Sequence, residues 1–154
     1  MSSTKPNSQD GIALTITRIF KAPPALVFKM WTDLEHTNRW CCPTGFTILK
    51  CTADFKVGGT YDTVMRSPDN TEHHVSGKYR VVEQDTCLEF THAWVDPDGN
   101  RGHESIVTIR FEEDGDTTRL TLTQSPMESE IARDMHQSGW EDTLNNLGPY
   151  IATV

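Results

Sequence analysis

The chain has 154 residues, 36% hydrophobic and 23% charged, a composition usual for a globular protein. Its length predicts one domain, and no apolar run is long enough to cross a membrane. The net charge of −8, without a cluster of Lys and Arg, argues against nucleic acid or an anionic membrane as a partner. Residues 1–10 are polar and predict a disordered tail before a domain over 11–154. They carry no secretion signal, so we expect a cytoplasmic protein.

One strand and two short helices are predicted first. Residues 12–20 alternate between apolar and polar side chains and are rich in β-branched residues, as in a strand. Pro23 and Pro24 end that strand and suit the first turn of a helix, predicted over 24–32 from its apolar spacing. Asp33 can cap a second short helix that runs to Trp40.

The apolar period changes to two residues from Gly45 onward, which indicates strands. Six are predicted, at 46–55, 59–66, 72–83, 87–95, 103–113 and 117–124. The short connections between them, rich in Gly, Pro, Asn and Asp, favour an antiparallel meander. Residues 128–151 show helical spacing and predict a long C-terminal helix.

This order predicts an α+β fold with a curved seven-stranded antiparallel sheet. A sheet of that size is too large to be covered by one helix unless it curls around the helix. We therefore expect the sheet to grip the C-terminal helix and leave a gap, the kind of place where a small apolar ligand binds.

The four cysteines do not form a metal-binding pattern. Cys41 and Cys42 are adjacent, and neither Cys51 nor Cys87 completes a zinc motif. In a protein expected to be cytoplasmic they are interpreted as reduced thiols. No cofactor and no metal site is predicted.

A family resemblance extends over residues 12–152. Its specific matches are Phe20-Lys21-Ala22-Pro23, Val27-Phe28, Trp31-Thr32-Asp33, Arg39-Trp40, Gly45-Phe46, Val57-Gly58-Gly59, Met65-Arg66, Pro68-Asp69, Leu88, Phe90-Thr91, Trp94, Thr108–Phe111, Thr118–Gln124, His136 and Gly139-Trp140. The chain resembles the heat-shock-protein-90 ATPase activator-like family of the SRPBCC (START-like, birch-pollen-allergen-like) superfamily. The resemblance implies the helix-grip fold. At Cys41-Cys42 the chain departs from the family, which usually has a Trp followed by Gly there, and we expect the smaller pair to reshape the pocket entrance.

Alternation assigns one face of each strand to the cavity. The predicted ligand-binding residues on that face, together with one from the C-terminal helix, are Tyr61, Thr63, Met65, His73, Val75, Tyr79, Phe90, His92, Trp94, His103, Ser105, Val107 and Met135. Met135 is chosen because it continues an apolar stripe from Ile131, whereas His136 is expected to flank the seam between helix and sheet.

The hairpin turns also predict a strand register. His92 should lie opposite Gly77 on one neighbouring strand and opposite Ser105 on the other. Trp94 should lie between Val75 and His103. Because His73 and His92 are offset along their strands, the histidines on this face are not expected to converge on a metal ion.

Three functions fit this pattern. The first is binding of a small apolar or aromatic molecule in the cavity, without covalent chemistry. The second is a cyclase-like or hydrolase-like enzyme that uses His92 with Ser105 or Tyr79. The third is a chaperone-associated protein that acts through its outer surface, a contact that the family resemblance suggests and the sequence itself does not support. An exposed strand edge could also pair two copies in a homodimer.

Overall fold

The computed structural model describes residues 11–154, and the tail predicted for residues 1–10 lies outside this range. The elements are β1 (Ile12–Phe20), α1 (Pro24–Thr32), α2 (Leu34–Trp40), β2 (Thr47–Ala53), β3 (Thr60–Arg66), β4 (Glu72–Glu83), β5 (Cys87–Val95), β6 (Ser105–Asp114), β7 (Thr117–Met127) and α3 (Glu130–Ile151). Each predicted element is present, and the order is the predicted one. No helix within residues 11–154 is long and apolar enough to cross a membrane.

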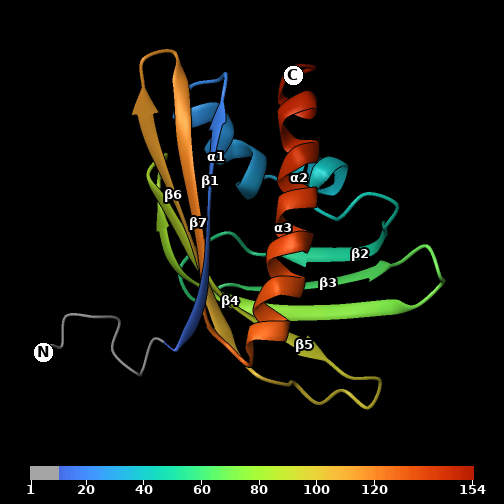
Figure 1. Cartoon of the computed structure of the whole chain (residues 1–154). Helices are drawn as coiled ribbons and strands as arrows, with labels where there is room; N and C mark the ends of the chain where they lie inside the picture. The colour runs from blue at the N-terminus through green and yellow to red at the C-terminus, as the bar shows by residue number, and fades with distance from the viewer. Residues whose placement is uncertain (1–10) are drawn as a thin grey trace, which may run out of the picture.

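The seven strands form one antiparallel sheet in the order β1-β7-β6-β5-β4-β3-β2. The sheet is curved: β1, β6 and β7 run alongside α3, whereas β2 to β5 cross behind it at a steep angle (Figure 1). The α+β helix-grip prediction is confirmed. β6 starts two residues later than predicted, at Ser105, and β7 continues to Met127.

Local sequence signals account for the helix starts. Pro23 and Pro24 stand at the cap and first position of α1, where a missing N–H costs no helical hydrogen bond. The Asp33 carboxylate accepts a hydrogen bond from the Glu35 N–H at 3.0 Å and caps α2. Ser129 caps α3 in the same way, accepting from the Ala132 N–H at 3.0 Å.

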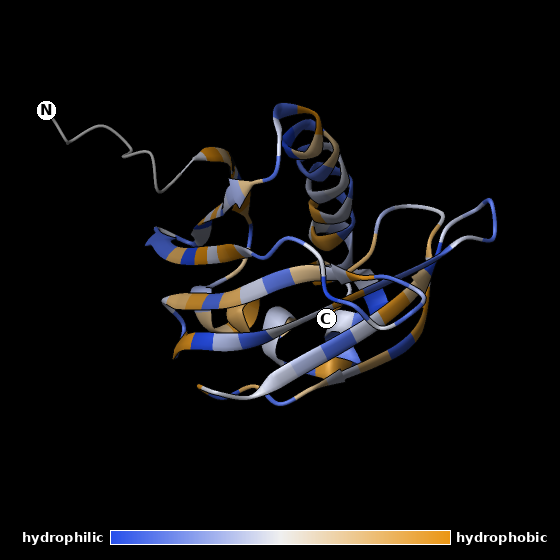
Figure 2. Cartoon of the chain, turned by 90° about the horizontal axis from the view of Figure 1, so that it is seen from below, coloured by the Kyte–Doolittle hydropathy of each residue, from blue (hydrophilic) through white to orange (hydrophobic). Residues whose placement is uncertain are grey.

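The packed core lies at the β1, β7 and β6 side of the sheet. Hydropathy alternates along the strands (Figure 2). Because successive side chains of a strand point to opposite faces, this alternation makes one face of the sheet apolar. Side chains from that face pack against α1 and the C-terminal half of α3, and include Leu14, Ile16, Val107, Ile109, Phe111, Leu120 and Leu122. From α3, Leu144, Leu147 and Ile151 complete this core. Burial of this apolar area is the main stabilising contribution.

The two halves of α3 differ in burial. Its buried residues are Thr143, Leu144, Leu147 and Ile151, all in the C-terminal half. None of residues 130–142 is buried. The prediction that Ile131 faces inward is wrong, since its side chain is 75% exposed. The N-terminal half of α3 therefore stands over the sheet without filling the space beneath it.

Candidate functional site

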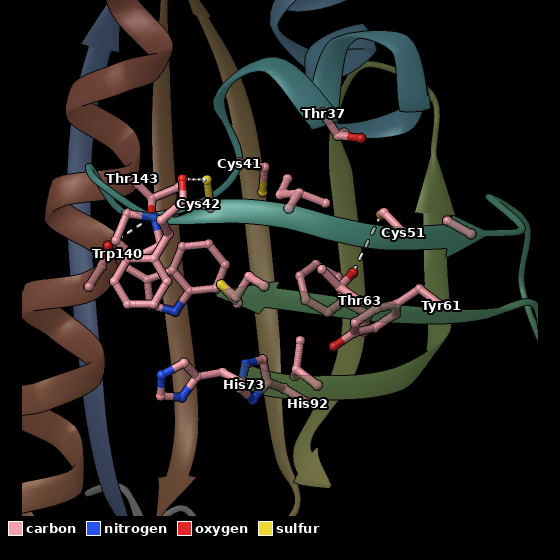
Figure 3. A pocket seen from close by; sticks show the side chains of 18 of the residues that line it. Thr37, Cys41, Cys42, Cys51, Tyr61, Thr63, His73, His92, Trp140 and Thr143 are labelled. Carbon is pink, nitrogen blue, oxygen red and sulfur yellow. Dashed lines mark hydrogen bonds between the residues drawn. The ribbon is translucent and has the colours of Figure 1, made fainter. Parts of the chain in front are cut away.

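A cavity of about 620 Å³ lies between α3 and the concave face of β2 to β5. Figure 3 shows side chains of the strands, of the segment after α2 and of α3 directed into one space, among them the labelled Tyr61, His92 and Trp140. The volume falls within the range of ~300–1,000 Å³ found for small-molecule sites. The wall is predominantly apolar and aromatic, as such sites are.

Three aromatic side chains of the strands, together with Phe55 just after β2, form an aromatic part of the wall. Tyr61 lies 5.7 Å from Tyr79 and 5.4 Å from Phe90 between ring centroids, and Phe55 lies 5.5 Å from Tyr79. These tilted and edge-to-face arrangements are the favourable ones for aromatic pairs. The strands thus present a rigid aromatic surface to anything in the cavity.

Gly77 makes room for this wall. A Cβ at this position would lie 1.9 Å from the Thr91 carbonyl oxygen and 2.6 Å from Cε1 of Tyr61. Because a side chain here would clash with backbone, only glycine fits. The Tyr61 hydroxyl uses the space to donate a hydrogen bond to the same Thr91 carbonyl at 2.7 Å. The pair fixes the orientation of the Tyr61 ring.

Trp94 and three histidines gather at one end of the cavity. The Trp94 ring lies 5.3 Å from that of His92, 5.9 Å from His136 and 6.2 Å from His73. The Trp94 side chain is 39% exposed, so this end opens to solvent. It is the mouth of the cavity.

Hydrogen bonding defines the protonation of His136. The Trp94 indole N–H, which can only donate, donates to Nε2 of His136 at 3.1 Å. Nε2 must therefore be unprotonated. Nδ1 lies 2.8 Å from the Ala132 carbonyl oxygen and is the atom that carries the proton and donates. His136 is uncharged in this arrangement, and it ties α3 to β5 across the mouth.

His92 is held uncharged by its surroundings. Burial, together with the neighbouring His136, lowers the pKa of His92 to about 3. Apart from a hydrogen bond to its own backbone, its imidazole makes no hydrogen bond to a residue within 11–154 in this structure. A neutral imidazole offers one donor and one acceptor to a cavity occupant.

Three thiols line the cavity, those of Cys41 and Cys42 just after α2 and that of Cys51 on β2. Burial raises the pKa of Cys41 to about 12 and also raises that of Cys42. The Cys51 thiol lies 3.4 Å from the Thr63 hydroxyl. Since the thiolate is the reactive form, Cys41 and Cys42 behave as small polarisable wall groups and not as nucleophiles.

The structure places ten of the thirteen predicted site residues on the cavity wall. They are Tyr61, Thr63, Met65, His73, Val75, Tyr79, Phe90, His92, Trp94 and Met135. Met135 is 70% exposed and reaches the wall from the rim. These placements bring the ten residues around one space, while their use in ligand binding stays a prediction.

Ser105 and Val107 face inward but lie away from the cavity wall. Val107 is fully buried in the packed core. Ser105 pairs with His92, as the register predicted, but its hydroxyl accepts a hydrogen bond from the Gln124 amide at 2.8 Å. The Gln124 carbonyl oxygen in turn accepts from the Trp140 indole at 2.8 Å. Ser105 belongs to a buried polar chain that joins the sheet to α3.

His103 corrects the predicted register. Trp94 pairs with Val75 as expected, but its carbonyl accepts from the Gly102 N–H at 2.8 Å, and His103 precedes β6. The His103 side chain is exposed, with Nε2 2.6 Å from the Pro126 carbonyl oxygen. Residues 103 and 104, which the alternation assigned to the strand, belong to the connection between β5 and β6.

Sequence reasoning missed the wall contributed by the helices and the segment after α2. The residues missed include Trp31, Phe46, His136 and Trp140. Cys41 and Cys42, which were expected to shape the entrance, also line the cavity. For His136 a signal existed. The buried residues Ile151, Leu147 and Leu144 define the inward face of α3, and steps of four residues back from Leu144 give Trp140 and then His136, not Met135.

Within the described part of the chain, no three His, Cys, Asp or Glu side chains are arranged to hold a metal ion. His73, His92 and His136 instead contact the Trp94 ring, as described above.

Solved structures with this fold come from several bacteria. The AHSA1 protein of Silicibacter pomeroyi is 27% identical with a TM-score of 0.85, covering 92% of this chain and 98% of its own. Proteins of Arthrobacter aurescens and Chromobacterium violaceum are 23% and 22% identical, with TM-scores of 0.82 and 0.80. The first covers 94% of this chain and 88% of its own, and the second 90% and 96%. At these identities the last two show the fold alone.

A search of curated proteins finds no match. The family model described as "Activator of Hsp90 ATPase homolog 1-like protein" matches residues 21–152. The match includes α1 to α3 and every strand except β1, and therefore every element that lines the cavity. The chain belongs to the Activator of Hsp90 ATPase homolog 1-like family, within the SRPBCC superfamily.

Proposed function

We propose that this protein binds a small apolar or aromatic molecule in the cavity between β2 to β5 and α3, without covalent chemistry. The observation that carries the proposal is the cavity itself, about 620 Å³ with a mostly aromatic and aliphatic wall. An apolar space of this size gains free energy when a ligand displaces its water. The ten wall residues named above are the proposed ligand-binding residues.

Binding is favoured over catalysis by the state of the candidate catalytic groups. The Ser105 hydroxyl lies off the wall and is bonded to Gln124. His92, with its pKa lowered to about 3, remains a neutral hydrogen-bonding group near neutral pH. A general acid or base works best with a pKa near the working pH, which His92 does not have.

The test is a titration followed by tryptophan fluorescence. Trp31, Trp94 and Trp140 line the cavity, so an occupant should change their emission. We expect saturable changes with members of a panel of fatty acids, flavonoids and polycyclic aromatics.

Two variants show whether the ligand enters the cavity. Val75→Trp should fill the cavity and abolish binding measured by calorimetry, because Val75 lies on the wall. Val57→Trp is the matched control, since Val57 is 65% exposed and away from the cavity. Folding of both is checked by circular dichroism. Absence of binding by any compound to the folded protein would contradict the proposal and favour a surface role, such as the chaperone association that the family name suggests.

A further inference from the structure

The cavity wall lacks a partner for a charged ligand. Of the described residues that line it, Glu128 alone is an Asp, Glu, Lys or Arg, and it lies exposed just before α3. No Lys or Arg of residues 11–154 contributes to the wall. A carboxylate moved from water into this space would lose its hydration without gaining a cation. Such a transfer is strongly unfavourable.

The titratable groups of the wall also favour their uncharged forms. The pKa of the Cys41 thiol, an acid, is raised by burial, and the pKa of the His92 imidazole, a base, is lowered by burial. Both shifts favour the uncharged form. Since an acid and a base shift in opposite directions, the common cause is poor solvation of charge and not an excess of one sign.

One hydroxyl in the wall has no protein partner. Tyr79 is 7% exposed, and its hydroxyl makes no hydrogen bond within residues 11–154 in this structure. Among the described residues, the side-chain nitrogen and oxygen atoms that are inaccessible to solvent and also lack a hydrogen-bond partner are Arg18 Nε and Trp31 Nε1. The Tyr79 oxygen lacks a partner but is not one of them, so it is accessible from the cavity. Tyr61, on the neighbouring strand, differs because its hydroxyl donates to Thr91.

The Tyr79 hydroxyl therefore sets a requirement on the ligand. Water that enters the cavity can accept its hydrogen bond, and a ligand that fills the cavity displaces that water. A ligand group that cannot replace the lost hydrogen bond loses affinity. A phenolic O–H is a donor, so the matching ligand group is an acceptor.

We propose that the ligand is an uncharged aromatic molecule with a hydrogen-bond acceptor, such as a ketone oxygen, that accepts from the Tyr79 hydroxyl. This inference rests on the proposed binding function and narrows its ligand class. It excludes anionic ligands such as fatty-acid carboxylates from tight binding in the cavity.

The experiment uses three probes of one shape, namely 2-acetylnaphthalene, 2-isopropylnaphthalene and 2-naphthoate, with binding measured by calorimetry at neutral pH. The ketone should bind at least about tenfold more tightly than the carboxylate, because only the carboxylate brings a charge into the cavity. Tyr79→Phe should weaken ketone binding about fivefold, the effect of a typical single hydrogen bond. The same variant should not weaken hydrocarbon binding and should strengthen it by a few-fold, because the hydrocarbon no longer leaves a hydroxyl without a partner.

Tyr150→Phe is the matched control. It removes the same hydroxyl from a tyrosine that lies off the cavity wall and faces His36. It should change the affinity of none of the probes.

The outcomes separate the two proposals. Hydrocarbon binding in the wild type, with no effect of Tyr79→Phe on the ketone, would overturn the acceptor requirement and leave the binding function standing. Tight naphthoate binding that Val75→Trp abolishes would overturn the requirement for an uncharged ligand. Failure of all three probes to bind the folded protein would count against both.

Discussion

The two halves of α3 face the same sheet and meet different environments. The C-terminal half places Leu144 and Leu147 against the packed core, at 2% and 0% exposure. The N-terminal half, from Glu130 to Asp142, buries no side chain and borders the cavity. The C-terminal half therefore stabilises the fold, and the N-terminal half leaves the cavity open beneath it. A sheet that curves around a single helix allows this division, because the helix can pack closely against only one part of the concave face.

The largest effect should come from the packed half. Leu147→Ala removes a fully buried side chain and should lower the free energy of unfolding by about 3 kcal/mol. Met135→Ala, three turns earlier on the same helix, should change it by less than about 0.5 kcal/mol because Met135 is 70% exposed. Urea unfolding of both variants measures the difference. Equal losses would show that the two halves are not distinct.

Acid should weaken the fold through the cavity region. The pKa of His92 is about 3 in the folded protein and ordinarily 6.5, so between these values the unfolded chain binds more protons. Stability should therefore fall as the pH drops below about 6.5. Between pH 7 and 4.5 this group contributes a loss of roughly 2–3 kcal/mol. After burial, the groups that act on His92 are the Arg101 guanidinium, which follows β5, and the His136 imidazole on α3, which would repel a protonated His92 if it were itself protonated.

His92→Phe isolates this contribution. The variant retains a ring of similar shape and cannot titrate, so its unfolding free energy should fall less steeply between pH 7 and 4.5. Urea unfolding at a series of pH values measures both slopes. Parallel curves for the wild type and the variant would mean that His92 is protonated as easily in the folded chain as in the unfolded one.

The sequence and the structure agree on the sheet and differ at its boundaries with the cavity. Alternation correctly gave the inward face of β5 and β6, and the turns correctly paired Trp94 with Val75 and His92 with Ser105. Alternation reports which face is covered. It does not report which part of that face is packed, so Val107 was expected in the cavity and lies in the core.

The remaining errors have local causes. His103 was counted in a strand because parity continues through a turn, whereas the Gly102 N–H bonds back to Trp94 and delays β6. The rotation of α3 about its axis decides which of its side chains line the cavity. The prediction took Ile131 and Met135 as the inward face and so assigned the wrong rotation. The N-terminal half of α3 has too few apolar residues to define an apolar stripe.

Within the cavity wall, two tyrosines should differ in what their hydroxyls contribute to stability. Tyr61→Phe removes a hydrogen bond to the Thr91 carbonyl and should cost about 1 kcal/mol. Tyr79→Phe removes no protein hydrogen bond and should stay within about 0.5 kcal/mol of the wild type. Thermal unfolding of the two variants in the absence of ligand gives the comparison. A larger loss for Tyr79→Phe would show that its hydroxyl has a structural partner.

The cap of α3 should have a small global effect and a larger local one. Ser129→Ala removes the acceptor of the Ala132 N–H, and caps typically contribute ~1 kcal/mol. Since the first turns of α3 bury no side chain, they can open while the core stays folded. We therefore expect a global loss of about 0.5 kcal/mol, at the low end for caps. Hydrogen exchange of amides in the first turns should become several-fold faster, whereas amides near Leu147 stay protected.

Asp33→Ala is the matched control for this cap. It removes the carboxylate that accepts from Glu35 at the start of α2, a helix anchored by the buried Trp40. The indole of Trp40 donates to the Met30 carbonyl at 3.1 Å, so α2 cannot fray without disturbing α1. The same kind of cap should therefore cost more here, about 1 kcal/mol, and the loss should appear in global unfolding. If Ser129→Ala costs as much as Asp33→Ala and exposes the whole of α3 at once, then the cavity-facing half is coupled to the core and moves only with it.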